Sequence, residues 1–88
     1  MAKTATPFGN ATMLERVSLP QTVGGKRFTT VLELLETDRG ERLVRVAYTT
    51  DGTVRRGPVT LRPRDLMRLR EALAKTPALA GLLTEAGA

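Results

Sequence analysis

The chain is predicted to fold as an α+β domain, in which a four-stranded curved antiparallel sheet is followed by one C-terminal helix. Four runs between residues 12 and 62 alternate apolar and polar side chains, and this period of two is typical of strands. Residues 63–76 instead carry leucines at helical spacing behind a proline. Because three of the connections are short, we expect an up-and-down sheet, with the helix covering one face and closing the core.

The length of 88 residues is sufficient for one domain. Residues 1–10 are rich in Ala, Thr, Pro and Gly and are expected to form a flexible N-terminal tail, which leaves residues 11–86 for the domain. A chain this short buries a smaller share of its surface than a large one, and pairing with a copy of itself adds stability. We therefore expect a homodimer.

The first strand is predicted at residues 12–19. At a period of two, Met13, Val17 and Leu19 share one of its faces. Pro20 is expected to end this strand. The segment that follows contains Gly24-Gly25 and is expected to be a loop over residues 21–26.

The second strand is predicted at residues 27–36 and carries apolar residues on both faces. A helix over residues 30–36 is the competing interpretation, but the Thr and Val content and the turn that follows at 37–40 favour a strand. A strand that is apolar on both faces is buried on both or meets a partner. One face is predicted to carry Phe28, Thr30, Leu32 and Leu34, and the other Val31 and Leu35.

The third and fourth strands are predicted at residues 41–50 and 53–62, joined by a hairpin. Asp51-Gly52 is a strong hairpin signal, because both residues tolerate a positive φ. Gly57-Pro58 interrupts the fourth strand, and since proline cannot donate to a ladder it indicates a bulge or an edge position.

The helix is predicted to begin at Pro63, with Asp65 near the positive end of its dipole, and to end at about Thr76 ahead of Pro77. Residues 78–85 fit either a short second helix or a kinked continuation. Their three leucines fit a dimer contact or the capping of the chain's own core, and they are Leu79, Leu82 and Leu83.

The composition excludes several kinds of chemistry. The chain has no Cys and no His, which removes disulfides, thiolate nucleophiles, histidine bases and ordinary zinc sites. No carboxylate spacing resembles a metal site, and the acidic residues surround a predicted hairpin tip. No apolar run is long enough for a membrane span, and residues 1–10 lack the centre of a signal peptide. We expect a cytoplasmic protein that is not an enzyme and needs no cofactor or metal, and association with the nucleoid is compatible with that location. Its Arg, Ala, Leu and Gly bias is typical of GC-rich bacterial or phage genomes.

The net charge of +5 and the sequence pI of about 10.8 are typical of a protein that binds a polyanion. Eleven of the fourteen basic residues are Arg, whose planar fork holds phosphate and stacks on bases. The positive charge is concentrated between residues 42 and 70, where eight arginines face two aspartates.

Two stretches resemble known families. The run Val54-Arg-Arg-Gly-Pro-Val-Thr-Leu-Arg-Pro63, followed by Asp65, Leu66 and Leu69, is similar to the fourth strand and helix start of the eukaryotic transcriptional positive cofactor four and its bacterial relatives. The stretch from Arg27-Phe28 through Asp38-Arg-Gly40 to Leu43-Val-Arg-Val46 resembles the Pur-alpha repeat. Both families share a four-strand-plus-helix unit that pairs and binds single-stranded nucleic acid. The resemblance implies the same fold, a homodimer and the same ligand for this chain, and it implies base stacking on Phe28.

The candidate nucleic-acid-binding residues lie on the predicted sheet and its rim. Arg55 and Arg56 form the candidate phosphate clamp beside Gly57, and the alternative is two solvated side chains. Arg45 is expected to look outward from the open face, and the alternative is a cross-strand pair with Glu33. Gly24-Gly25-Lys lacks the remaining residues of a nucleotide-hydrolysing loop, so its basic residues are expected to form a basic rim. The full set is Lys26, Arg27, Phe28, Arg42, Arg45, Arg55 and Arg56.

The functional hypothesis is a homodimer that binds single-stranded DNA or RNA with low sequence specificity, as a cofactor in transcription or DNA maintenance. It predicts salt-sensitive binding, since each neutralised phosphate releases counterions. The alternative is a protein–protein interaction module that docks on transcription or replication machinery. Binding to duplex DNA ranks last, because no helix-turn-helix is visible in the sequence.

Overall fold

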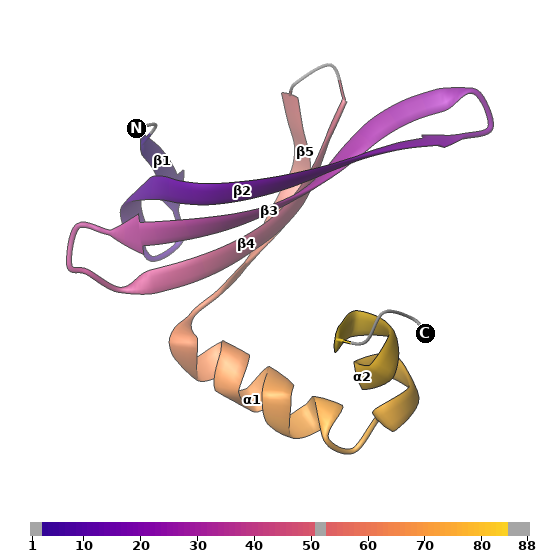
Figure 1. The fold of residues 1–88 in the computed structure, drawn as a ribbon. Coiled ribbons are helices and arrows are strands. Elements are labelled where there is room, and N and C mark those ends of the chain that lie inside the picture. Colours follow the sequence, from indigo (N-terminus) through magenta and orange to yellow (C-terminus); the bar gives the residue numbers. More distant parts are fainter. Residues whose placement is uncertain (1–2, 51–52, 85–88) are drawn as a thin grey trace.

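A computed structural model describes residues 3–50 and 53–84, with the backbone alone for residues 53–57 (Figure 1). The chain forms one antiparallel sheet, with strands in sequence order, followed by two helices. The antiparallel sheet and the C-terminal helix are as predicted, but the sheet has five strands and the helical part has two helices. The elements are β1 Lys3–Thr6, β2 Gly9–Val23, β3 Lys26–Thr37, β4 Arg42–Thr50, β5 Thr53–Leu61, α1 Pro63–Leu73 and α2 Pro77–Thr84.

The additional strand, β1, forms where the sequence predicted a flexible tail. It pairs with β2 from Lys3 opposite Thr12 to Thr6 opposite Gly9. Two features close this hairpin. The Thr6 hydroxyl donates to the Gly9 carbonyl at 2.7 Å and accepts the Phe8 N–H at 3.0 Å, and Gly9 takes a φ of +111°. The small and polar residues that read as a tail therefore make a tight turn.

Strand β2 continues past Pro20, where the sequence predicted its end, and of the loop predicted at residues 21–26 only Gly24-Gly25 form a turn. Pro20 lies opposite Thr29 within the ladder, and the hairpin closes at Gly24-Gly25, which have φ values of +57° and +80°. Because β1 pairs with the first four residues of β2, the rest of β2 is an edge strand. Proline is tolerated on an edge strand because its missing N–H need not serve a neighbour.

A bulge at Leu14 changes which side chains share a face of β2. The register with β3 shifts between Met13 and Glu15. An extra residue in a strand reverses the alternation beyond it. Met13 therefore lies on the opposite face from Val17 and Leu19, and the prediction that these three share a face is wrong.

The bulge predicted at Gly57-Pro58 is confirmed by the pairing of β4 with β5. Val46 lies opposite Val59, but Tyr48 lies opposite Arg55, so the register shifts in between. The predicted Asp51-Gly52 turn lies outside the described residues.

The sheet curls toward one of its faces, here called the inner face. The guanidinium of Arg45 in β4 donates a hydrogen bond of 3.0 Å to the hydroxyl of Thr4 in β1, although β2 and β3 lie between these strands. In a flat sheet those strands are about 14 Å apart, so the bond requires the sheet to bend. The inner face carries Ala11, Met13, Arg16, Val31, Glu33, Leu35, Thr37, Leu43, Arg45, Ala47 and Thr49. The opposite, outer face carries Val17, Leu19, Phe28, Leu32, Leu34, Val44, Val46, Tyr48 and Val59.

The hydrophobic core lies inside the curl and comes entirely from the sheet. Ala11, Leu35 and Leu43 are fully buried, and Met13 packs against them. Val31 is also buried, with 1% of its surface exposed. The residues of the inner face thus cover one another as the sheet closes.

A row of charged side chains crosses the inner face. Arg16, Glu33 and Arg45 lie directly opposite one another on β2, β3 and β4. The Glu33 carboxylate is 2.7 Å from Nε of Arg45 and 3.7 Å from Nε of Arg16. The side chains of Glu33 and Arg45 are 6% and 12% exposed, so this pair is held away from water.

The helices do not cover the sheet, and the expectation that a helix closes the core is wrong. Pro63 is the first residue of α1, as predicted, and a separate α2 begins at Pro77. No residue of either helix is buried, and α1 packs mainly against β5 and α2. In Figure 1 the helices stand apart from the sheet and join it at the end of β5. Neither helix combines the length and apolarity needed to cross a bilayer.

Arg62 fixes the direction in which α1 leaves the sheet. Its backbone N–H donates to Oδ2 of Asp65 at 3.0 Å, and its Nε donates to the same oxygen at 2.8 Å. Its guanidinium also lies 5.0 Å from the centre of the Phe8 ring, a cation–π contact with the β1–β2 turn. The hydrogen bonds from Arg62 lower the pKa of Asp65 from 3.8 to about 2.

Removing the carboxylate of Glu33 is expected to destabilise the fold. The Glu33→Ala variant leaves the Arg45 charge buried without its partner, and breaking a buried pair in this way lowers the free energy of unfolding by about 3 kcal/mol or more. Urea unfolding followed by circular dichroism at a fixed protein concentration measures the change. Glu36→Ala is the control, because its cross-strand pair with Arg42 is exposed and its loss is expected to change stability by about 1 kcal/mol or less. Equal losses in the two variants would refute the role of the buried row.

Asp65 is expected to make stability depend on pH in the acid range. The pKa of Asp65 is lower in the folded state than in the unfolded state. Its contribution to the free energy of unfolding is therefore fully present above about pH 4 and is lost as the pH falls through about 2. Asp65→Asn is therefore expected to be less stable than the wild type at pH 6, with the difference shrinking between pH 4 and pH 2. Thermal unfolding at a series of pH values measures this, with Glu71→Gln as the control. A difference that stays constant across this range would contradict the assignment.

Candidate nucleic-acid interface

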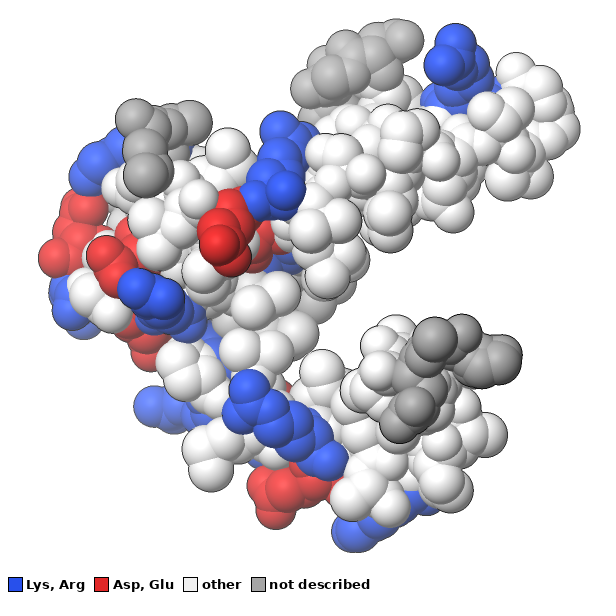
Figure 2. All heavy atoms as spheres, in the orientation of Figure 1, with Lys and Arg blue, Asp and Glu red and all other residues white. Residues whose placement is uncertain are grey.

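The two ends of the sheet differ in how their charged side chains are paired. At the end near the β3–β4 turn, Lys3 is paired with Asp38 at 2.8 Å and Arg42 with Glu36 at 3.3 Å, while Arg39 in the turn makes no described ion pair. The other end, here called the distal end, is formed by residues 18–30 and 47–50 with the start of β5. Residues 18–30 and 47–50 contain no Asp or Glu, and Asp51 in the adjoining turn lies outside the described residues. On the face shown in Figure 2, red atoms gather at the first end, while the β2–β3 arm is white with blue near its tip.

Two basic residues of the candidate set, Lys26 and Arg27, lie at the distal end. They are the first residues of β3, directly after the Gly24-Gly25 turn, and both are exposed. No carboxylate in the described part of the chain forms an ion pair with either of them. Two cations thus lie exposed at the tip of the β2–β3 hairpin, where the sequence predicted a basic rim.

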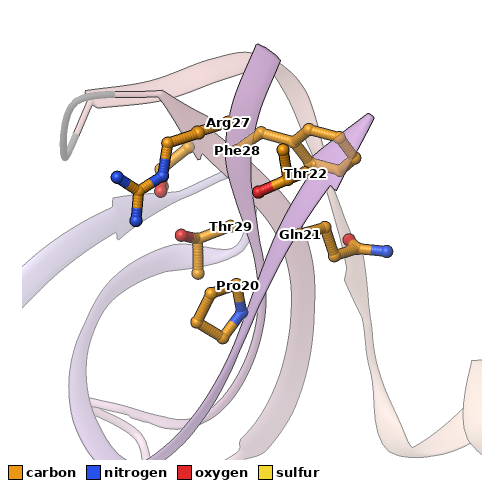
Figure 3. Close-up of a pocket in the computed structure, with 7 residues that line it drawn as sticks. Pro20, Gln21, Thr22, Arg27, Phe28 and Thr29 are labelled. Carbon is orange, nitrogen blue, oxygen red and sulfur yellow. The ribbon is translucent and has the colours of Figure 1, made fainter. Parts of the chain in front are cut away.

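A pocket of about 340 Å³ opens beside Arg27 (Figure 3). Figure 3 shows the side chains of Arg27 and Thr29 on the same side of the hairpin. Since Val31 faces inward, strand alternation places both on the inner-face side. The pocket therefore combines a planar cation with hydroxyl groups, which are the donors that bind phosphate oxygens. Its lining residues are Pro20, Gln21, Thr22, Arg27, Phe28, Thr29 and Thr49.

Phe28 points to the other side of the same hairpin. Its ring meets that of Tyr48 edge-on, with the centroids 6.3 Å apart and the planes at 80°. Phe28 is half-buried, whereas Tyr48 is 41% exposed. Tyr48 shares the outer face with Val44 and Val46, and the helices do not cover that face, so the ring is open to solvent.

The backbone of Arg55 and Arg56 lies at the distal end of the sheet. Arg55 pairs with Tyr48, which in turn pairs with Thr30 of β3. This register brings β5 into the same part of the sheet as Phe28. The side chains of both arginines lie outside the described residues, so their clamp remains a prediction.

Arg42 and Arg45 lie toward the other end of the sheet. The expectation that Arg45 looks outward from an open face is wrong, because its side chain lies inside the curl. The alternative that the sequence offered, a cross-strand pair with Glu33, is confirmed. Arg42 is exposed and paired with Glu36. The structure therefore separates these two arginines from Lys26 and Arg27.

Helix α1 and the residues just after it carry a second group of exposed basic residues. In the described part of the chain, Arg64, Arg68 and Arg70 in α1 and Lys75 after it make no ion pair, and all four are exposed. These side chains form a solvated basic surface on the helical part of the chain.

Comparison of this chain with protein-family models, with curated proteins and with solved structures finds no match. The described residues also contain no cluster of three His, Cys, Asp or Glu side chains that could hold a metal ion. The argument for function therefore rests on the geometry and the charges of the distal end.

Proposed function

We propose that the protein binds single-stranded nucleic acid, DNA or RNA, at the distal end of its sheet, with little sequence preference. The observation that carries this proposal is the separation of charge along the sheet. Lys26 and Arg27 are exposed and form no ion pair with a described carboxylate, whereas at the opposite end Lys3, Arg42 and Arg45 are ion-paired and Arg39, in the β3–β4 turn, is not. An unpaired cation is available to a phosphate, and an ion-paired one is not.

The pocket supports contact with a sugar-phosphate backbone. Arg27 offers a planar fork to phosphate oxygens, and the threonines beside it offer hydroxyl donors. Such contacts position a strand without reading its base edges, which accounts for the low specificity proposed. The proposed physiological role is in transcription or in the protection of exposed strands.

The aromatic pair favours a single strand over a duplex. Phe28 and Tyr48 lie on the outer side of the hairpin that carries Arg27. Unpaired bases can stack on exposed rings, and each such contact adds about 1–3 kcal/mol where it forms. Bases inside a duplex are already stacked and cannot reach these rings.

Removing the two hairpin cations is expected to weaken binding and its dependence on salt. The variant is Lys26→Gln/Arg27→Gln, and the matched control, Arg39→Gln/Arg42→Gln, removes the same charge at the other end. Loss of two phosphate contacts is expected to reduce the slope of log affinity against log salt by about 1.4 and to weaken binding at low salt by about tenfold or more. Fluorescence anisotropy with a labelled strand of about 20 nucleotides measures both, because that length spans more than one binding unit.

The same titration includes the duplex form of the labelled strand. Tighter binding of the single strand, with the control variant unchanged, supports the proposal. Equal weakening in the two variants would show that net charge, and not the distal end, holds the ligand. If neither form binds at low salt, the alternative of a protein-docking module takes its place.

Ligand binding is also expected to quench the emission of Tyr48. This is the one tyrosine in a chain without tryptophan, so intrinsic emission reports on the distal end alone. Titration with an unlabelled single strand is expected to quench it in parallel with the anisotropy change, and Lys26→Gln/Arg27→Gln is expected to shift both curves together. Binding by anisotropy with unchanged emission would place the ligand elsewhere, for example on α1.

A further inference from the structure

The helices of this chain present apolar side chains that the rest of the described structure leaves exposed. In α2, Leu79, Leu82 and Leu83 are spaced to share one face, and they are 53%, 71% and 64% exposed. In α1, Met67 and Leu69 are also exposed. A helix with an apolar stripe is expected to bury it against another layer. Of the two alternatives for these leucines, the capping of the chain's own core is therefore not what the structure shows.

The outer face of the sheet is a second uncovered apolar surface. Val17, Leu19, Leu32 and Val59 are each more than 40% exposed. Between β2, β3 and β4 this face holds a mainly apolar groove of about 210 Å³, which includes Val17 and Leu32 and reaches Val44. Its size fits side chains such as leucine from an opposing helix.

The chain exposes far more surface than its mass requires. Its accessible surface is 6702 Å² for 9.6 kDa, whereas a compact monomer of that mass exposes about 5,100 Å². Its radius of gyration is 14.6 Å, against about 12 Å for a compact domain of this length. Figure 2 shows the reason, an open hollow between the β2–β3 arm and the helices.

The chain's own helices are held away from its own sheet. A single residue, Arg62, separates β5 from α1, and it is bound both to Asp65 in the helix and to the Phe8 ring. Folding the helices back over the sheet would require these contacts to break. The partner that covers the outer face must therefore come from elsewhere.

We propose that two copies of this chain pair around a twofold axis, and that each lays its α1–α2 helices on the outer sheet face of the other. A second copy carries both surfaces, so a twofold arrangement buries each of them twice. If each copy buries its surplus, the total is about 3,200 Å², which is within the range of permanent homodimers. This pairing leaves Arg27 and its pocket open, because they lie on the inner side of the hairpin. Phe28 and Tyr48 share the outer face with the groove, but the groove at Val17 and Leu32 lies farther from the hairpin tip than these two rings.

Oligomeric state without nucleic acid tests the pairing. Sedimentation equilibrium is expected to give twice the chain mass for the wild type, and the single-chain mass for Leu82→Glu and for Leu32→Glu. Both side chains are exposed in the single chain, so circular dichroism is expected to show that the variants stay folded. The control is Thr76→Glu in the turn between the helices, which is expected to remain a dimer. A wild type of single-chain mass at micromolar concentration would overturn the proposal.

Crosslinking tests the reciprocal arrangement and does not depend on the glutamate variants. The chain has no cysteine, so Leu32→Cys and Leu82→Cys introduce single thiols on the sheet and on the helix. When the two variants are mixed and treated with a short bismaleimide, the mixed pair is expected to crosslink more than either variant alone. A predominant sheet–sheet or helix–helix product would refute it. The double variant Leu32→Cys/Leu82→Cys is treated in the same way. A crosslink between its two thiols within one chain would also refute the arrangement, because it would show that the helices fold back over their own sheet.

These outcomes are separable from those of the proposed function. A monomer that still binds a single strand through Lys26 and Arg27 would overturn the pairing and leave the proposed function intact. A dimer that binds no nucleic acid would do the reverse.

Discussion

The rest of the structure depends on the buried pair of Glu33 and Arg45. A carboxylate and a guanidinium on the inner face are tolerated because they neutralise each other and because Thr4 accepts a further hydrogen bond. That bond is available only if the sheet bends far enough to bring its first strand over its fourth. The bend in turn encloses Leu35 and Leu43 without a helix. Because the sheet supplies its own cover, the helices are left without a role in the core.

The same pairing explains why positive charge is available at the distal end. The carboxylates of β3 lie at Glu33 and Glu36, where they pair with the arginines of β4. Residues 17–32 contain no acidic side chain, and no described carboxylate pairs with Lys26 or Arg27. The placement of the carboxylates on β3 thus leaves two cations available at one end, although the net charge of +5 belongs to the whole chain.

Local signals predicted much of the fold, and long-range effects account for what they missed. The strand at 27–36, the turn that follows it, the bulge at Gly57-Pro58 and the start of α1 at Pro63 all have short sequence signatures, and the structure contains them. The bulge at Leu14 has no such signature, because an extra residue in a strand is visible only from its partner's register. The burial of Arg45 was missed because it depends on which face the sheet bends toward. Phe28 and Arg27 were chosen from local signals, and strand alternation places them on opposite faces. Which of the two faces is the inner one follows from the direction in which the sheet bends.

The two faces of the β2–β3 hairpin separate the proposed phosphate pocket from the proposed pairing groove. Arg27 and its pocket lie on the inner side, whereas the apolar groove that holds Val17 and Leu32 lies on the outer face. A second copy on the outer face would therefore leave the polar side open. A twofold pair would also place two distal ends on one particle, and a strand long enough to reach both would bind its second site at a high effective concentration. Affinity would then rise steeply with strand length although each pocket makes few contacts, which is how a small chain with a weak site can hold an extended polymer.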